Sequence, residues 1–320
     1  MRIGFEEAAD FLNGCTDVLI ITHASPDGDT LGCGFGLCRA LRQCGKKADV
    51  VCADPIPPRY DFLKEWYAPQ GFEPKQIIAV DIADTKLMGR LSDYGDKVDL
   101  CIDHHITNTG YAKRLLLGEK SAAACEVVYT LLKTAGMPID ETAAMCLYTG
   151  IATDTGCFKF ESVTPETHMI AAELYRYEFP LPAAKLNRWL FDIKSQSRVK
   201  AEGIIIKNTE LLCDGKCAMT SVTLDEERES GISADDFDGI ASLPMQFEGV
   251  EIAVTVREKD PGRFKISIRT GTDANASRIC SSFGGGGHIR AAGCTITGRL
   301  DDVKAQLLKA CAEELHNVGY

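Results

Sequence analysis

The chain has 320 residues, of which 45% are hydrophobic and 25% carry charge. Length and composition together favour about two compact domains and exclude an intrinsically disordered, collagen-like or low-complexity chain. The formal net charge of −11 disfavours a broad basic groove for long nucleic acids. A short phosphorylated ligand still fits this charge, provided that local arginines or bound metal ions offset the repulsion.

The N-terminal segment, MRIGFEEAADFLNG, carries acidic side chains where a signal peptide has its apolar core. No apolar run elsewhere approaches the roughly 18 residues that a membrane-spanning helix needs. The cysteines are scattered singly, and Cys213 and Cys217 lack both the spacing and the matching second pair of a zinc site. We therefore expect a cytoplasmic protein with buried, reduced thiols and no membrane partner.

Short apolar runs alternate with helical patterns in the first half of the chain. Strands are predicted at residues 18–22, 48–52, 76–80 and 98–102. The spacing of apolar residues predicts helices at 29–43, 122–135 and 141–151. The strands are apolar on both faces, as in a sheet that helices cover on both sides. This alternation predicts an α/β domain with a doubly wound parallel sheet.

Residues 186–202 have a helical pattern, are more basic than their surroundings and show no strand signal. We place a helical linker there, which predicts one domain over 1–185 and a smaller α+β domain over 203–320. In the second domain, alternating apolar and polar residues predict half-buried antiparallel strands. These strands are placed at 203–212, 216–222, 250–257 and 263–269. The predicted helices lie at 225–230, 274–282 and 300–317.

Acidic and imidazole side chains follow the ends of several predicted strands. His23, Asp27 and Asp29 follow the first strand. An aspartate before a helix often only caps it, so this segment alone leaves a structural role open. The pattern recurs, however, at two later strand ends and after one helix, which add Asp81, Asp84, Asp103, His104, His105 and Asp154. Because open α/β sheets bind ligands at the carboxyl ends of their strands, we expect these side chains to converge on one site.

Converging carboxylates repel one another in a partly desolvated cleft, and bound cations relieve this repulsion. Two divalent cations bridged by a carboxylate would orient a water, lower its pKa and stabilise an in-line displacement at phosphorus. Oxygen and imidazole ligands favour Mn²⁺, with Mg²⁺, Co²⁺ or Fe²⁺ as alternatives, and argue against structural zinc. Cys101 and Cys157 are expected in the core, and His168 and His316 at the surface. The predicted reaction class is hydrolysis of phosphoesters.

Four successive glycines precede His288, namely Gly284, Gly285, Gly286 and Gly287. Glycine allows backbone N–H groups to approach an anion closely, and Arg269, His288 and Arg290 can add side-chain donors. A flexible linker or a turn is the alternative, but this run lies between helical and strand patterns rather than between domains. We therefore predict an anion-binding site in the second domain.

Five motifs together resemble the DHH/DHHA1 phosphoesterase family: His23-x3-Asp27-x-Asp29, Asp81-x2-Asp84, Asp103-His104-His105-x2-Asn108, Thr153-Asp154-Thr155-Gly156-x-Phe158, and GGGGH at 284–288 followed by Ala291-Ala292-Gly293. The likeness spans essentially the whole chain in order. Length and layout look most like the stand-alone nanoRNases that also hydrolyse 3′-phosphoadenosine 5′-phosphate. The resemblance implies a DHH catalytic domain with two metal ions, a DHHA1 substrate-binding domain and a homodimer.

The resemblance also implies the metal ligands. One ion would be held by His23, Asp27 and Asp81. The other would be held by Asp29, Asp81, His104 and Asp154, with Asp81 as the bridge between the two.

Further roles follow from the same resemblance. Asp103 would orient an imidazole, His105 would face the substrate phosphate, and Asp84 would support these catalytic residues. Substrate contacts are expected from Asn108, Arg290, Arg269 and His288, the last two clamping the distal phosphate above the glycine backbone. The chain departs from many relatives at Lys86 and Leu87, where an arginine is expected, and Arg90 is the candidate substitute.

The expected activity is metal-dependent hydrolysis of very short RNA, of linear dinucleotides such as pApA, and of adenosine 3′,5′-bisphosphate (pAp). A single-stranded DNA exonuclease resembling RecJ is an alternative, which the lack of an OB-like domain and of a basic track with aromatics disfavours. A cyclic-di-AMP phosphodiesterase and a manganese pyrophosphatase are further alternatives. A non-catalytic nucleotide-binding module would have lost at least one of the ligands, and none is substituted here.

Overall fold

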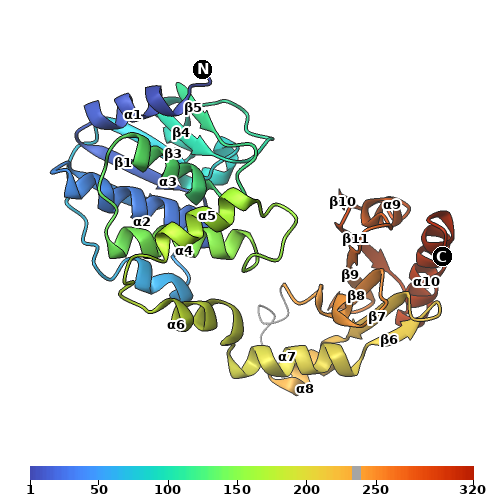
Figure 1. Ribbon diagram of the computed structural model, residues 1–320. Helices are drawn as coiled ribbons and strands as arrows, with labels where there is room; N and C mark the ends of the chain where they lie inside the picture. Colours follow the sequence, from blue (N-terminus) through green and yellow to red (C-terminus); the bar gives the residue numbers. More distant parts are fainter. Residues whose placement is uncertain (233–238) are drawn as a thin grey trace. The chain divides into compact units, whose positions relative to one another are not determined.

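The computed structural model describes residues 1–232 and 239–320 (Figure 1). The chain divides into two compact units, which we call the first unit (Met1–Ile193) and the second unit (Lys194–Tyr320). No helix among these residues is long and apolar enough to cross a bilayer.

The stretch predicted as a helical linker is not one continuous helix. It begins within α6 (Ala183–Asn187), continues through the π-helical turn η3 (Arg188–Asp192), and is interrupted before α7 (Gln196–Lys207). The Ser195 side chain accepts a hydrogen bond from the backbone N–H of Arg198 and thereby caps the start of α7. The division between the two units falls at this interruption.

A five-stranded parallel sheet forms the centre of the first unit, with the strand order β2-β1-β3-β4-β5. Its strands are β1 (Val18–Thr22), β2 (Ala48–Cys52), β3 (Gln76–Val80), β4 (Leu100–Asp103) and β5 (Arg114–Leu117). The predicted parallel sheet is confirmed, and β1, β2 and β3 have the predicted bounds. The sequence patterns do not predict the short edge strand β5.

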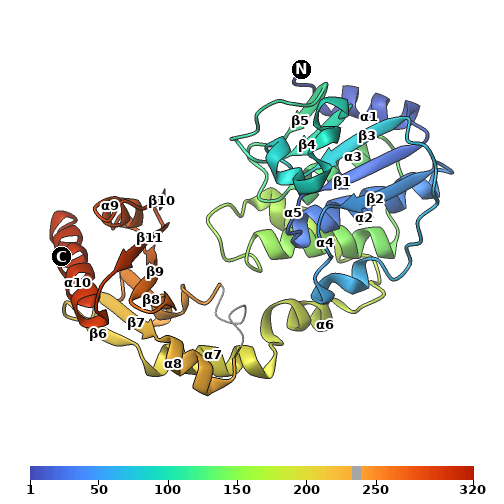
Figure 2. The same cartoon turned by 180° about the vertical axis from the view of Figure 1, so that it is seen from behind.

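Helices cover the sheet of the first unit. They are α1 (Phe5–Gly14), α2 (Gly28–Gln43), α3 (Ala124–Thr134), α4 (Glu141–Asp154) and α5 (Pro165–Leu174), with the 3₁₀ segments η1 (Pro58–Leu63) and η2 (Thr85–Lys97). One face of the sheet shares its core with α1, α2 and α3. The opposite face, seen in Figure 2, has a smaller core that includes Ile77, Cys101 and Met88 of η2. The strand ends are therefore held between two packed layers.

Helix α2 is buried along most of its length and packs closely on α4. A Cβ atom at Gly32 of α2 would lie 2.5 Å from the carbonyl oxygen of Cys146 in α4, so only glycine permits this approach. α4 itself extends to Asp154, three residues beyond the predicted end. Asp154 is therefore the last residue of a helix that this packing holds in place.

Six strands form the sheet of the second unit, with the order β10-β11-β9-β8-β7-β6. They are β6 (Glu210–Leu212), β7 (Cys217–Val222), β8 (Ile252–Asp260), β9 (Arg263–Thr270), β10 (Gly286–His288) and β11 (Ala291–Thr297). β7 and β8 run parallel, so the prediction of antiparallel strands is wrong for this pair. The other neighbours are antiparallel. The strand predicted at 203–212 is wrong in its first half, because α7 continues to Lys207.

Helices pack on both faces of the second sheet. They are α7, α8 (Leu224–Ser230), α9 (Ala276–Ser281) and α10 (Leu300–Asn317), with the 3₁₀ turn η5 (Leu243–Gln246). Ile279 of α9 and Leu307 of α10 lie in one core, and Ile205 of α7 lies with Val222 in another. Since β8 is covered on both faces, its first six residues are buried, whereas β9 alternates as predicted.

Candidate metal centre and phosphate site

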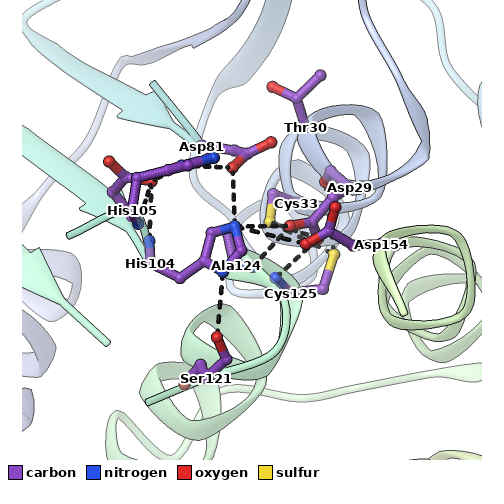
Figure 3. Close-up of polar contacts among 12 residues, drawn as sticks. Asp29, Thr30, Cys33, Asp81, His104, His105, Ser121, Ala124, Cys125 and Asp154 are labelled. Atoms are coloured by element: carbon purple, nitrogen blue, oxygen red, sulfur yellow. Dashed lines mark hydrogen bonds and ion pairs between the residues drawn. The ribbon is translucent and has the colours of Figure 1, made fainter. Parts of the chain in front are cut away.

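The side chains that follow the strand ends of the first unit converge (Figure 3). His23 follows β1, and its Nε2 lies 3.6 Å from Oδ2 of Asp81, which follows β3. His104 follows β4, and its Nε2 lies 3.7 Å from Oδ1 of the same aspartate. Asp81 therefore lies between the two histidines and presents one carboxylate oxygen to each.

Two groups of candidate ligands share this centre. His23 Nε2 is 3.5 Å from Asp27 Oδ1, and within the group of His23, Asp27 and Asp81 the donor atoms lie within 4.8 Å of one another. A second group, also within 4.8 Å, joins three further residues, namely Asp29, His104 and Asp154. The structure brings together all six residues that the sequence nominated as metal ligands.

The backbone at Asp81 has a left-handed conformation. Its φ is +58°, a left-handed conformation that is uncommon for residues other than glycine, asparagine and aspartate. The Asp81 N–H donates to the carbonyl of Ile102 in the neighbouring strand β4, and the Thr30 hydroxyl donates to the carbonyl of Val80. These bonds fix the turn that aims the Asp81 side chain at the two histidines.

Asp27 caps a helix and also faces the candidate metal centre. Its Oδ1 accepts hydrogen bonds from the N–H groups of Asp29 and Thr30, and so caps α2. The same oxygen faces His23 Nε2. The helix cap thus fixes the position of a candidate ligand.

Asp29 is 1% exposed and is held by the first turn of α3. Its Oδ2 accepts from the N–H of Ala124 at 2.6 Å, and its Oδ1 accepts from the N–H of Cys125 at 3.0 Å. A Cβ atom at Gly150 would lie 2.6 Å from Asp29 Oδ1 and 2.2 Å from Cys125 Sγ, so glycine is required there. Sequence patterns give no signal for these backbone donors, and Gly150 stands in an apolar helix without a visible reason.

Thiols also border this carboxylate. Cys33 Sγ lies 3.4 Å from Cys125 Sγ and 3.9 Å from Asp29 Oδ1. Burial raises the pKa of both thiols well above the ordinary value. Together with Asp29, these two thiols form a further group of potential ligand atoms within 4.8 Å of one another. Cys101, as predicted, is buried in the core.

Three carboxyl groups of the centre have raised pKa values, so a nearby positive charge would stabilise their ionised forms. Burial, together with the charge of Asp29, raises the pKa of Asp81 well above its ordinary value. Burial and neighbouring aspartates also raise the pKa of Asp29 and of Asp154 to about 6. Oδ1 of Asp81 is buried and has no hydrogen-bond partner among the described residues. A donor set of carboxylates and imidazoles with an unpaired buried oxygen fits divalent cations such as Mn²⁺ or Mg²⁺.

Asp103 orients His105. Its Oδ1 lies 2.8 Å from His105 Nδ1 and also accepts from the backbone N–H groups of His104 and His105. The bond to Asp103 raises the pKa of the His105 imidazole to about 9, against the lowering effect of burial. His105 is partly exposed, so a protonated imidazole is presented at the edge of the centre.

Asn108, proposed from the sequence as a substrate contact, is engaged within the protein. Its amide N–H₂ donates to Asp103 Oδ2 at 2.6 Å and to the carbonyl of Ile82, and its Oδ1 accepts from the N–H of Gly110. With these partners, Asn108 holds the Asp103 carboxylate in place.

Asp84 and Arg90, which follow Asp81 in the chain, make structural contacts. Asp84 Oδ1 accepts from the N–H of Lys86 and caps η2. The guanidinium of Arg90 donates to the carbonyls of Ala53 and Cys52, which connects η2 to the segment after β2. Leu87 is 45% exposed. Neither Asp84 nor Arg90 belongs to the ligand groups around Asp81.

In the second unit, Arg269 and His288 lie in one row across the sheet. Ala291 of β11 pairs with Arg269 of β9 on one side and with His288 of β10 on the other. Directly paired residues point to the same face, with about 5 Å between neighbours. The two positions therefore lie about 10 Å apart on one face, with only the small side chain of Ala291 between them.

The glycine run forms part of the sheet rather than a flexible linker. A Cβ atom at Gly285 would lie 2.3 Å from the carbonyl oxygen of Gly293, and one at Gly287 would lie 2.6 Å from that of Ala291. The N–H groups of Gly284 and Gly285 donate to carbonyls in the last turn of α9. These two N–H groups are therefore occupied, which corrects the expectation that the whole run offers donors to an anion.

Arg290 is likewise engaged within the protein. Its guanidinium donates to the carbonyls of Ala274 and Thr272, ahead of α9. Among the residues that the structure describes, the Arg269 guanidinium donates only to the carbonyl of its neighbour Ile268. Among the described residues near the glycine run, Arg269 and His288 thus keep the donors best placed for a phosphate.

The fold and the donor set define a two-part α/β protein with a candidate centre for divalent cations. Residues 17–151 match the DHH family, N-terminal domain, and residues 214–317 match the DHHA1 domain. Over 310 residues the chain is 34% identical to the bifunctional oligoribonuclease and PAP phosphatase NrnA of Thermus thermophilus, covering 95% of this chain and 91% of that protein. The chain belongs to the DHH family, and the resemblance based on its motifs is confirmed.

Other relatives agree with this assignment. The protein of the same name from Bacillus subtilis is 26% identical over 306 residues, which cover 92% of this chain and 95% of that protein. A crystal structure of an exopolyphosphatase-related protein from Bacteroides fragilis matches 99% of this chain and 97% of its own, with a TM-score of 0.84 and 22% identity. At that identity the likeness concerns the fold alone.

Proposed function

We propose that this chain is a metal-dependent phosphoesterase that hydrolyses short oligoribonucleotides, linear dinucleotides such as pApA, and pAp. The observation that carries the proposal is the convergence of three aspartates and two histidines around Asp81. The printed activities of the Thermus and Bacillus relatives, oligoribonuclease and PAP phosphatase, support the choice of substrates. The net charge of −11 agrees with a short substrate.

We assign two divalent cations, with Mn²⁺ first, to the centre. His23, Asp27 and Asp81 would hold one of them, and Asp29, Asp81, His104 and Asp154 would hold the other. When bound, such a pair supplies positive charge for the phosphate and lowers the pKa of a water for attack. The unpaired Oδ1 of Asp81 and the mutual repulsion of the carboxylates support this assignment.

The remaining chemistry belongs to side chains of the protein. His105, which Asp103 holds in the protonated form, donates a proton or a hydrogen bond to an oxygen of the reacting phosphate. Asp103 and Asn108 keep that imidazole in one orientation. In the second unit, Arg269 and His288 bind the terminal phosphate across Ala291. We assign Asp84 and Arg290 to structural support of these two sites.

The decisive experiment compares hydrolysis of pApA, a pentaribonucleotide and pAp by the purified chain with Mn²⁺ and with chelator. The proposal expects hydrolysis of all three with Mn²⁺ and none with chelator. Preference for a long single-stranded DNA would favour the RecJ-like alternative, and cleavage of cyclic di-AMP alone would favour the cyclic-dinucleotide alternative. Binding of pApA without cleavage would indicate a non-catalytic module.

We also propose, from the family, that the chain forms a homodimer in the cytoplasm. Light scattering coupled to size-exclusion chromatography measures the mass directly, and a value near the 34.8 kDa of one chain would reject the dimer. Cell fractionation with an antibody against the chain tests the compartment.

A further inference from the structure

The first turn of α3 contacts two candidate ligands of the same cation. Its N–H groups at Ala124 and Cys125 bind Asp29, and the carbonyl of Ser121, just before it, accepts from Nδ1 of His104 at 3.1 Å (Figure 3). With Nδ1 acting as the donor, Nε2 of His104 keeps its lone pair for the centre. A displacement of this turn would therefore disturb both ligands at once.

This turn has no cap of its own. The N-cap position of α3 is Ala123, whose side chain cannot accept a hydrogen bond. Asp29, 95 residues earlier in the chain, accepts from the first two N–H groups of α3 instead. The turn that precedes the helix must then be held by other contacts.

Glu126 supplies the side-chain contact. Its Oε2 accepts from the N–H of Ala122 at 3.2 Å, and its own N–H donates to the carbonyl of Ala123. Ala122 directly follows Ser121, so this bond fixes the peptide whose oxygen orients His104. Further bonds, from the Ser121 N–H to the Gly118 carbonyl and from the Gly118 N–H to the Asp103 carbonyl, fasten the other end of the loop.

Glu126 is a costly residue at this position. It is 3% exposed, burial raises the pKa of its carboxyl group although the Thr167 side chain nearby lowers it, and among the described residues its Oε1 has no partner in hydrogen-bond geometry and no cation forms an ion pair with it. Burying a carboxylate with an unpaired oxygen opposes folding, and an apolar side chain would avoid this cost. A role in the centre next to it accounts for such a residue better than packing does.

We propose that Glu126 is a positioning residue for the metal centre: through Ala122 it fixes the Ser121 carbonyl, which sets the tautomer and orientation of His104. The proposal deepens the proposed function, since it names a residue on which the binding of the second cation depends. Such outer contacts typically change metal affinity by about 10- to 100-fold.

The test uses the full chain with Glu126→Ala and Glu126→Gln. Glutamine keeps an oxygen for the Ala122 N–H, whereas alanine removes it. ¹H–¹⁵N spectra of the imidazoles in metal-free protein report the His104 tautomer, and calorimetry with Mn²⁺ reports affinity. We expect Glu126→Ala to lose the single tautomer and to bind Mn²⁺ about 10- to 100-fold more weakly, and Glu126→Gln to remain within about threefold of the wild type.

Val128→Ala is the matched control, because Val128 is buried on the same helix and its side chain has no polar atom that could accept from the N–H of Ala122. It lowers the melting temperature without changing the tautomer or the affinity for Mn²⁺. A Glu126→Ala variant that lowers only the melting temperature, as the control does, would overturn the proposal. Should Glu126→Ala not fold, Glu126→Asp, one methylene too short to reach Ala122, takes its place with the same expectations.

The tautomer measurement needs neither metal nor substrate. If the wild type bound no Mn²⁺ and cleaved nothing, the proposed function would fail, while the spectra would still decide whether Glu126 sets the state of His104. An unchanged His104 spectrum in a folded Glu126→Ala chain that hydrolyses pApA normally would reject the positioning role alone.

Discussion

Asp103 and His105 form a hydrogen-bonded pair at the edge of the candidate centre, with 2.8 Å between Asp103 Oδ1 and His105 Nδ1. Because this bond holds the imidazole in its protonated form, the pKa of His105 reaches about 9. The pair links a buried carboxylate to a partly exposed donor, so its charge state sets the pH range in which the donor can act.

The first prediction concerns Asp103→Asn. The amide keeps an oxygen for the backbone N–H groups but removes the charge that raises the pKa of His105, so this pKa should fall from about 9 toward the ordinary value of 6.5. Because the proposed function makes the protonated imidazole the active form, the alkaline limb of kcat/KM should move to lower pH by a similar amount. A pH-rate profile measures this shift. An alkaline limb unchanged in Asp103→Asn would show that His105 is not the group that titrates.

The second prediction concerns Asp81, the proposed bridge between the two cations. Asparagine tolerates the left-handed φ of +58° at position 81, so Asp81→Asn removes the charge without adding backbone strain. We expect Mn²⁺-dependent hydrolysis of pApA to fall by at least about 10²–10³-fold and Mn²⁺ to lose its stabilising effect on the melting temperature. Circular dichroism should show an unchanged fold. Thermal shifts with and without Mn²⁺ that match those of the wild type would contradict the bridging role.

The third prediction concerns pH and metal affinity. Burial lowers the pKa of His23, but hydrogen bonds to Asp27 and Asp81 outweigh burial and raise it to about 11, while Asp29 and Asp154 titrate at about 6. A cation must displace these protons, so Mn²⁺ should bind more tightly at pH 8 than at pH 6. Calorimetry in two buffers of different ionisation enthalpy measures the protons released. Binding without proton release would show that His23 is not a ligand.

The fourth prediction concerns Arg269 and His288, which lie in one row across the sheet of the second unit. Arg269→Ala and His288→Ala should raise KM for substrates with a terminal phosphate and change kcat little, because these side chains bind the phosphate without touching the reacting bond. Arg263→Ala is the control, since Arg263 is exposed at the other end of β9. Steady-state kinetics on pApA and on ApA distinguish the outcomes. Equal effects on both dinucleotides would argue against recognition of a terminal phosphate.

The fifth prediction separates two glycines of one run. A methyl group at Gly285 would meet the carbonyl of Gly293, whereas one at Gly286 has open space. Gly285→Ala should destabilise the second unit by about 1–3 kcal/mol, and Gly286→Ala by less than about 0.5 kcal/mol. Amide hydrogen-exchange rates in β11 (Ala291–Thr297) measure this loss of stability close to the substituted glycine. Equal exchange rates in the two variants would mean that the run does not depend on close packing.

Hydrophobic patterns predict the central parallel sheet and most helices because both faces of β1, β3 and β4 are apolar. They fail for β5, where RLLL is too short to show a period, and for 203–207, where Ile204, Ile205 and Ile206 suggest a strand. There the chain stays helical because Ala201 and Ile205, four residues apart, share one core. Alternation also cannot distinguish a parallel neighbour from an antiparallel one, which explains the error at β7 and β8.

The sequence predicts that these side chains converge because strand ends of a parallel sheet meet at one edge, and the resemblance to the DHH/DHHA1 family selects the candidate ligands among them. Their supports could not be named in the same way. The Ser121 carbonyl and the N–H of Ala124 belong to the backbone and carry no residue-type signature. For the same reason the sequence overestimates how many N–H groups of the glycine run can bind an anion. Nothing in the sequence reveals that the N–H groups of Gly284 and Gly285 already donate to α9.

One atom, Asp27 Oδ1, serves both the candidate cation site and the N-terminus of α2, so a substitution at position 27 affects both. Since Oδ1 both caps α2 and faces His23, a lineage that gives up catalysis is not free to take any residue at this position. Serine and asparagine also cap helices well, and alanine costs about 1 kcal/mol at a cap. Descendants that abandon the reaction should therefore carry serine or asparagine at position 27, a trace of the ancestral enzyme in an otherwise intact fold.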